Sequence, residues 1–370
     1  MKRLRAFLQR KDIVFSGKRY GIDALGAMAQ GLFCTLLVGT ILNTIGQQFA
    51  IGFLNEIIVT VGKGDGAVSY TIGGLASAMV GPGIAIAIGT ALHAPGLVLF
   101  SLIPVGFAAN AMGGAGGPLA VYFVAILACE CGKLVSKETK IDILVTPIVT
   151  ILAGIGFAAL VAAPIGTAAK AVGQAIMWAT ELQPFFMGII VSVLVGIALT
   201  LPISSAAICA SFGLVGLAGG AAVAGCCAQM VGFAVMSFRE NRWGGLVAQG
   251  VGTSMLQMPN IVKNPRIWIP PTLASAITGP LATCLFQLKM NDPGGGLASG
   301  MGTCGFVGQI GVYSGWVNDV ATGAKTAITA MDWIALALIC FVLPAVLSWF
   351  FCLILRRWGW IKENDLKLDL

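Results

Sequence analysis

Long runs of apolar residues, separated by short polar segments, dominate the chain. About 20 apolar residues cross the hydrocarbon of a bilayer as a helix, and several runs reach or approach that length. In chain order, the predicted spans are 24–46, 70–92, 96–112, a fourth that ends near residue 131, 143–163, 267–288 and 331–355. Together with the apolar region 185–235, they predict an all-α polytopic membrane protein with about 8–10 transmembrane helices.

Some segments do not fit a plain succession of spans. Residues 167–181 are less hydrophobic and predict a connecting helix, and 245–259 is too short and too polar to cross. The region 185–235 is almost wholly apolar but is interrupted at 202–205. Simple spans give an odd number of crossings between two basic loops here, although both loops should lie in the cytoplasm. The region therefore holds either a re-entrant hairpin or a further crossing, and both remain open. The glycine-rich segment 292–315 is a second candidate for a re-entrant hairpin.

This pattern divides the chain into four parts. We expect a basic cytoplasmic segment at 1–20, an N-terminal membrane half at 21–182, a C-terminal membrane half with re-entrant hairpins at 183–355, and a cytoplasmic tail at 356–370.

Composition excludes a soluble or disordered chain. Charged residues make up 10% and hydrophobic residues 57%, whereas roughly a quarter of the residues in a soluble domain are charged. The 50 glycines are about twice the average share. Disorder requires high charge and few aliphatic residues, which is the opposite composition. In a bilayer, glycine instead lets helices approach one another closely.

The net charge of +7 is concentrated beside the apolar spans. Seven Lys and Arg residues lie between Lys2 and Arg19, and Arg356 and Arg357 follow the last span. By the positive-inside rule, such clusters orient a membrane protein with both termini in the cytoplasm. We therefore predict no nucleic-acid partner.

The sequence contains few residues for catalysis. Its ten cysteines lie mostly in apolar runs, and it has a single histidine. It has no P-loop, no G-x-S-x-G and no H-E-x-x-H motif. We therefore expect no self-contained catalytic site and predict no metal or cofactor.

Prolines and uncharged polar residues gather between 252 and 281. The prolines at 259, 265, 270 and 271 prevent a continuous helix, and irregular backbone at membrane depth occurs only where it is buried in protein or lines a wet cavity. Hydroxyl and amide side chains in this stretch suit the hydroxyls of a polar solute. The predicted substrate-binding residues here are Thr253, Ser254, Gln257, Asn260 and Asn264. The alternative is an ordinary cytoplasmic turn with Lys263 and Arg266 as topology charges.

Further polar residues in the apolar spans are candidates for function. Ser204 and Ser205 interrupt the region 185–235, and Asp319 follows the second glycine-rich segment, so all three join the predicted substrate site. Glu130 and Lys133 have the i,i+3 spacing of a local ion pair on a helix.

A family resemblance appears in the proline-rich stretch. Pro259, Ile261-Val262, Asn264-Pro265 and Ile269-Pro270 resemble a signature of the membrane component IIC of bacterial sugar phosphotransferase systems. Ser204–Gly213 and the glycine-rich loop resemble a IIC-like subfamily of membrane toxin regulators, such as the perfringolysin regulator.

The resemblance implies a homodimeric permease in a bacterial cell membrane. One half of each protomer would form the dimer interface and the other would carry a sugar, which cytosolic IIA and IIB proteins phosphorylate on entry. The sugar-binding glutamate of the family would fall at Gly252-Thr253, and no acid lies between Trp243 and Leu288. A permease for a sugar or similar polar solute is therefore the first hypothesis, at most the membrane subunit of a protein-phosphohistidine-sugar phosphotransferase. A membrane-embedded solute sensor without phosphotransfer is the alternative.

Overall fold

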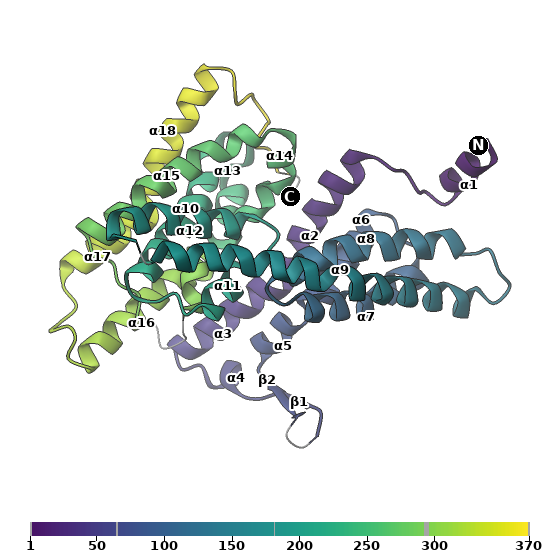
Figure 1. The fold of residues 1–370 in the computed structure, drawn as a ribbon, viewed down its shortest axis with the longest axis horizontal. Helices are drawn as coiled ribbons and strands as arrows, with labels where there is room; N and C mark the ends of the chain where they lie inside the picture. The colour runs from purple at the N-terminus through teal and green to yellow at the C-terminus, as the bar shows by residue number, and fades with distance from the viewer. Residues whose placement is uncertain (1, 64–65, 181, 292–295, 369–370) are drawn as a thin grey trace. The chain divides into compact units, whose positions relative to one another are not determined.

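The computed structural model describes residues 2–63, 66–180, 182–291 and 296–368 (Figure 1). The chain is almost entirely helical, which confirms the prediction of an all-α polytopic membrane protein. It divides into two units, residues 1–168 and 169–370. This division falls inside one long helix, whereas we expected the two halves to change at 182–183, a boundary that remains a prediction.

The first unit combines long helices with several short elements, where η denotes a 3-10 or π turn. Its elements are α1 Lys2–Arg10, η1 Arg19–Asp23, α2 Ala24–Leu32, η2 Phe33–Leu37, α3 Val38–Gln48, α4 Gly52–Asn55, β1 Val59–Val61, β2 Val68–Tyr70, α5 Ile72–Ala78, α6 Val80–Ala91, α7 Gly96–Gly113, η4 Gly114–Gly116, α8 Gly117–Val135 and the start of α9 Asp142–Thr180.

The first predicted span is confirmed as the consecutive helical segments α2, η2 and α3. The second begins differently from the prediction, because β1 and β2 form an antiparallel hairpin with Val59 opposite Tyr70. The sequence did not single out this hairpin, although β-branched residues on both sides of a glycine-rich turn are a hairpin signal. Beyond it, α5 and α6 form a span bent by 53°.

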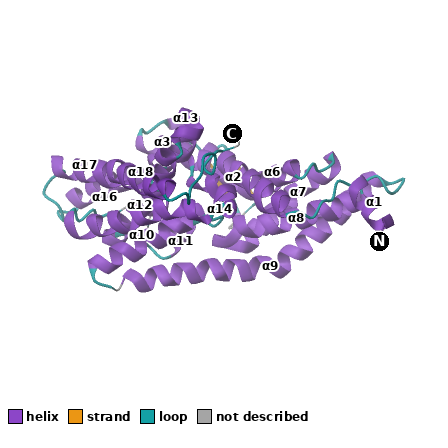
Figure 2. Cartoon of the chain, turned by 90° about the horizontal axis from the view of Figure 1, so that it is seen from above, coloured by secondary structure: helices purple, strands orange, loops and turns teal. Residues whose placement is uncertain are grey.

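The third and fourth spans form a helical hairpin. Helices α7 and α8 pack against each other, and the chain turns between them at Gly114, whose φ of +52° favours glycine. Helix α9 runs without a break through 39 residues (Figure 2). The predicted fifth span and the connecting helix predicted at 167–181 are thus one helix as far as Thr180, and Glu181 lies outside the described residues.

The second unit consists of longer helices separated by short ones. After the end of α9, its elements are α10 Pro184–Thr200, α11 Ser205–Ser211, α12 Gly216–Met236, α13 Phe238–Val247, η5 Ala248–Gly252, η6 Ser254–Gln257, α14 Met258–Lys263, η7 Pro265–Trp268, α15 Ile269–Pro280, η8 Leu281–Leu285, η9 Leu297–Gly300, η10 Cys304–Phe306, α16 Val307–Ala321, α17 Ala330–Ala337, η11 Leu338–Val342 and α18 Leu343–Arg357.

Three helices with glycines at their contacts form the centre of the second unit. Helices α10, α12 and α15 pack together (Figure 1). A Cβ added to Gly225 of α12 would meet the backbone carbonyl of Ser192 on α10, and one added to Gly279 of α15 would meet the carbonyl of Gly188 on α10. Because these backbones touch, dispersion contacts hold the helices together in the absence of a hydrophobic driving force.

The two candidate re-entrant regions, 185–235 and 292–315, contact each other in this unit. The region 185–235 consists of α10, the seven-residue α11 and α12. The Ser205 hydroxyl of α11 donates to the Gly300 carbonyl of η9 at 2.7 Å. Both candidates for re-entrant hairpins therefore contain short helices in contact, while 292–295 lies outside the described residues.

Within the described ranges, five helices are long and apolar enough to cross a membrane, or six if the bent α5–α6 pair is one span. One of the five, Gly96–Val135, comprises α7 and α8, which pack against each other. The predicted total of about 8–10 crossings therefore remains a prediction.

The glycine contacts generate a stability prediction. Gly225→Val should destabilise the second unit by about 1–3 kcal/mol, because overpacking pushes α12 away from α10. Thermal unfolding of the purified protein in detergent measures the effect. Gly156→Val on α9 is the matched control, since nothing lies within 4 Å of a Cβ placed there. Equal stability of the two variants would contradict the packing described.

Candidate functional site

The proline-rich stretch folds into a chain of short helices, as predicted. Each proline lies in the first turn of its element, at Pro259 in α14, Pro265 in η7, and Pro270 and Pro271 in α15. A proline costs no hydrogen bond in that position, because the first N–H groups of a helix have no partner within it. Pro265 thus accounts for the break at Asn264, where the backbone is extended before η7.

Three predicted residues lie together and form, with Gln249, a cluster of side-chain amides. We call Gln249, Gln257, Asn260 and Asn264 the amide cluster. Gln257 is 0% exposed and Asn260 is 5% exposed. Gln257 Nε2 donates to Gln249 Oε1 at 2.8 Å, and Asn260 Nδ2 donates to Gln257 Oε1 at 2.9 Å. Gln249, Gln257 and Asn260 therefore form one hydrogen-bonded chain of amides, while the Asn264 side chain bonds elsewhere.

The end of the described chain lies against the amide cluster. We call Trp358–Leu368 the tail segment. Its side chains Ile361 and Leu366 are 2% and 0% exposed. Its oxygens accept four bonds from the cluster: Leu366 O from Gln257 Nε2 at 3.0 Å, Lys367 O from Asn260 Nδ2 at 2.8 Å, and Trp360 O and Asp365 Oδ2 from Asn264 Nδ2 at 2.9 and 2.8 Å. We predicted 356–370 as a cytoplasmic tail, and the structure shows its described part packed onto the second unit.

Asn241 holds the tail segment from a further side. Its Nδ2 donates to Leu366 O at 2.7 Å, and its Oδ1 accepts from the backbone N–H of Leu368 at 2.8 Å. Near the start of the segment, Arg356 pairs with Glu240. The ends of α13 and α18 are thereby joined beside the amide cluster.

A second group of polar side chains lies deeper in the unit. We call Thr200, Gln229, Ser254, Trp268 and Thr272 the inner polar cluster. The hydroxyls of Thr200 and Ser254 lie 2.8 Å apart. Trp268 Nε1 donates to Gln229 Oε1 at 2.9 Å, and Gln229 Nε2 donates to Thr272 Oγ1 at 3.3 Å. Through these bonds α10 and α12 contact the broken stretch at both of its ends.

The remaining predicted residues form hydrogen bonds outside the amide cluster. The Thr253 hydroxyl caps η6 by accepting from the N–H of Met255, and the Ser204 hydroxyl caps α11 by accepting from the N–H of Ala207. Ser205 bonds to Gly300, and Asp319 accepts from Asn291 Nδ2 at 2.8 and 3.0 Å. The structure thus places Gln257, Asn260 and Asn264 near one another, whereas Ser204 caps its own helix and Ser205 and Asp319 have partners elsewhere in the unit.

The sequence did not single out several residues that these clusters require. Gln229 is the one amide in α12 and is 0% exposed. A polar residue inside an apolar span is costly and marks function, so this signal was present. Asn241 and the tail segment carried no such signal, because their pairing joins positions more than a hundred residues apart.

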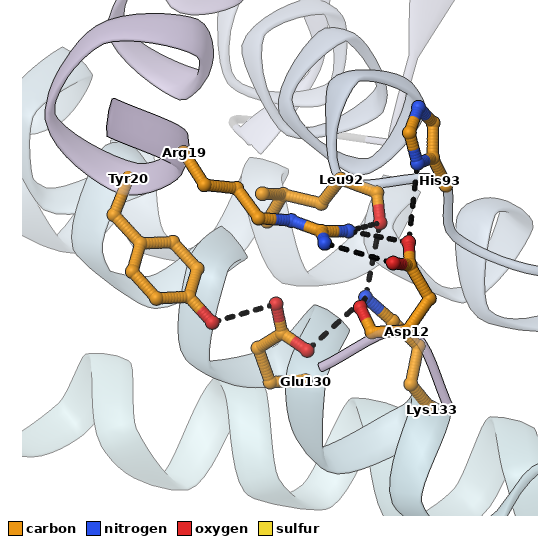
Figure 3. Close-up of polar contacts among 7 residues, drawn as sticks. All are labelled: Asp12, Arg19, Tyr20, Leu92, His93, Glu130 and Lys133. Carbon is orange, nitrogen blue, oxygen red and sulfur yellow. Dashed lines mark hydrogen bonds and ion pairs between the residues drawn. The ribbon is translucent and has the colours of Figure 1, made fainter. Parts of the chain in front are cut away.

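The first unit contains a separate ionic cluster, made of Asp12, Arg19, Tyr20, His93, Glu130 and Lys133 (Figure 3). Lys133 is 1% exposed, and its Nζ lies 3.2 Å from Glu130 Oε2. The predicted i,i+3 pair is therefore confirmed. The same ammonium donates to the backbone carbonyls of Asp12 and Leu92 at 2.7 and 3.0 Å. Lys133 is thus held by one ion pair and two hydrogen bonds.

Arg19 completes this cluster from the start of η1. It grips Asp12 with two bonds of 3.0 and 2.6 Å and also donates to the Leu92 carbonyl. This guanidinium holds the pKa of the Asp12 carboxyl well below its usual range. His93 Nδ1 lies 3.1 Å from the same carboxylate, at the edge of a cleft of about 430 Å³. The cluster fastens the segment before Arg19 to the α6–α7 turn and to α8, which is an anchoring role.

The ionic cluster predicts an asymmetric effect of mutation. Lys133→Met should destabilise the first unit by about 3–5 kcal/mol, because it leaves the buried Glu130 carboxylate unpaired. The double variant Glu130→Gln/Lys133→Met should recover much of that loss. Thermal unfolding in detergent measures both, with the exposed Lys140→Met as the control. A double variant no more stable than Lys133→Met would contradict the pairing.

Comparison with known proteins supplies the family. No curated protein and no solved structure matches the chain. The model of a family described as "Phosphotransferase system, EIIC" matches residues 22–368. The match identifies this family and not a subfamily within it, so the resemblance to toxin regulators remains a prediction. Since the match covers nearly the whole chain and the fold has several membrane-spanning helices, the chain belongs to the EIIC family, the multi-pass membrane components of sugar phosphotransferase systems.

Proposed function

We propose that this chain is the permease subunit of its phosphotransferase system and that the amide cluster binds the solute it carries. The family places a sugar substrate and cytosolic IIA and IIB partners with such a component in general. The observation that carries the proposal is the burial of Gln257 and Asn260 in a proline-broken stretch. Buried amides in a membrane protein are costly unless they have a use.

The alternative of an ordinary cytoplasmic turn fits these residues poorly. A solvated turn leaves its amides exposed to water, whereas Gln249 and Gln257 are both 0% exposed. The inner polar cluster also ties the stretch to the packed helices α10 and α12. A stretch held this firmly can present its amides in a fixed geometry, which is what recognition of a polar solute requires.

The same proposal assigns roles to the two units. Because the amide cluster lies in the second unit, that unit carries the solute, and the first forms the interface of a homodimer. The basic segments near both ends face the cytoplasm by the positive-inside rule, where IIA and IIB proteins would meet the chain. Ser204, Ser205 and Asp319 then have structural roles rather than contacts with the solute: Ser204 caps α11, Ser205 supports the α11–η9 contact, and Asp319 holds Asn291.

A solute sensor is the second candidate function. The observation in its favour is the stretch from Trp243 to Leu288, which carries no acid to hold the hydroxyl that accepts a phosphoryl group. A protein that binds a solute without phosphorylating it needs no such carboxylate. The absence of this carboxylate argues against phosphotransfer, but it argues neither against solute binding nor against transport.

Reconstitution distinguishes these functions. We expect liposomes containing the purified chain to exchange labelled solute with an internal pool, using a panel of hexoses, hexitols and sugar acids. Exchange without phosphoenolpyruvate and partner proteins would support a permease and argue against obligatory phosphotransfer. Binding of a panel member with no exchange in either direction would favour the sensor.

A substitution in the amide cluster tests the binding site. Gln257→Ala should weaken binding of the transported solute by about 1–2 kcal/mol, because one donor is lost. The tail segment keeps its bonds to Asn241, Asn260 and Asn264, so the variant does not free it. Isothermal titration measures the affinity, and Gln183→Ala, just before α10, is the control. An unchanged affinity in Gln257→Ala would move the site elsewhere.

A further inference from the structure

The direction of the hydrogen bonds in the amide cluster is fixed by a backbone carbonyl. Gln249 Nε2 donates to the Gly245 carbonyl at 2.9 Å. A carbonyl can only accept, so the amide nitrogen of Gln249 must point that way and its oxygen must face Gln257. Gln257 must then donate with its nitrogen, and its oxygen must accept from Asn260. The orientation of each amide follows from the one before it.

This orientation leaves the cluster with donors for whatever occupies it. The oxygens of Gln249 and Gln257 are engaged inside the cluster, and the Asn264 oxygen accepts from the N–H of Arg266. The groups that face the tail segment are N–H groups of Gln257, Asn260 and Asn264. All of them meet oxygens, three from backbone carbonyls and one from the Asp365 carboxylate.

The charged residues around the cluster also favour an anionic ligand. No acid lies between Trp243 and Leu288, while Lys263 and Arg266 stand exposed beside Asn264. Within the described ranges, the carboxylate that contacts the cluster belongs to the tail segment, at Asp365. Two cations and several N–H donors create a site that favours negative charge.

A neutral sugar fits this site poorly. Each hydroxyl brings a proton as well as lone pairs, and a buried O–H without an acceptor costs free energy. Asn241 Oδ1, which accepts from the backbone N–H of Leu368, is already engaged. A carboxylate brings acceptors alone, and hydrogen bonds to a charged group are stronger than those between neutral groups.

We propose that the amide cluster binds a sugar acid, whose carboxylate takes oxygen positions now held by the tail segment. This rests on the proposed function, since it names the solute class of the same site. In the absence of the solute, oxygens of the tail segment occupy the positions that the carboxylate oxygens would take. Binding of the acid therefore releases the tail segment from Gln257, Asn260 and Asn264.

Two ligands that differ only at the relevant group test the solute class. D-Gluconate and D-glucitol share a six-carbon chain, and the acid has a carboxylate where the polyol has a primary alcohol. We expect the purified chain to bind gluconate at least about tenfold more tightly than glucitol, because one charge-assisted hydrogen bond changes affinity by about that factor. Glucuronate and glucose form a second pair with the same expected order. These comparisons need no mutation and so no assumption about folding.

Release of the tail segment gives an independent readout. Hydrogen exchange of the amides in 361–368 should accelerate on addition of gluconate and stay unchanged with glucitol. Asn264→Asp should lower gluconate affinity by about tenfold or more, because it sets a carboxylate against the ligand. Asn318→Asp on α16 makes the same change of charge at another half-buried position and should have no effect.

The outcomes separate this inference from the proposed function. Glucitol or glucose binding at least as tightly as its acid would overturn the solute class and leave the permease intact. Gluconate binding that is unaffected by Asn264→Asp, or that leaves exchange of 361–368 unchanged, would overturn the assignment to the amide cluster. If no member of either pair bound, the solute class would be overturned, and the proposed function would be decided by the exchange assay with the full panel.

Discussion

The hydrogen bonds between the amide cluster and the tail segment satisfy the polar side chains that the proline-broken stretch buries in the second unit. Prolines break the helix here, and the resulting turns bury side-chain amides that water cannot reach. A buried amide without a partner costs about 1–3 kcal/mol, so Gln257 and Asn260 need acceptors. The tail segment supplies them from positions more than a hundred residues away. The tail segment is therefore packed as part of the second unit.

The packed helices give this arrangement its rigidity. Glycines let α10, α12 and α15 touch at the backbone, and the inner polar cluster then joins two of these helices to the broken stretch. Backbone contact leaves little freedom for one helix to shift against another. The amides are consequently held by a firm frame on one side and by a segment without regular helix on the other. Any rearrangement at the site is easier on the side of the tail segment.

The sequence predicted those features that depend on neighbours in the chain. Apolar runs located the spans, prolines located the breaks, and an i,i+3 spacing gave the Glu130–Lys133 pair. Features that join distant positions could not be predicted this way. Asp12 meets Lys133, and Asn241 meets Leu366, yet nothing local to either residue indicates its partner. The continuity of α9 was missed for a related reason, since a helix can continue after its hydrophobicity falls.

The choice of amides over cations in the cluster has a physical consequence for transport. A guanidinium would hold an anion more strongly, but a carrier must also release its solute, so moderate donors favour turnover. An empty cluster would then expose several unpaired N–H groups in a dry site, and that state would be high in free energy. In the proposed carrier, the tail segment would lower this cost by supplying oxygens whenever the solute is absent. Filling the site from within the chain would thus stabilise the unloaded state and keep binding reversible.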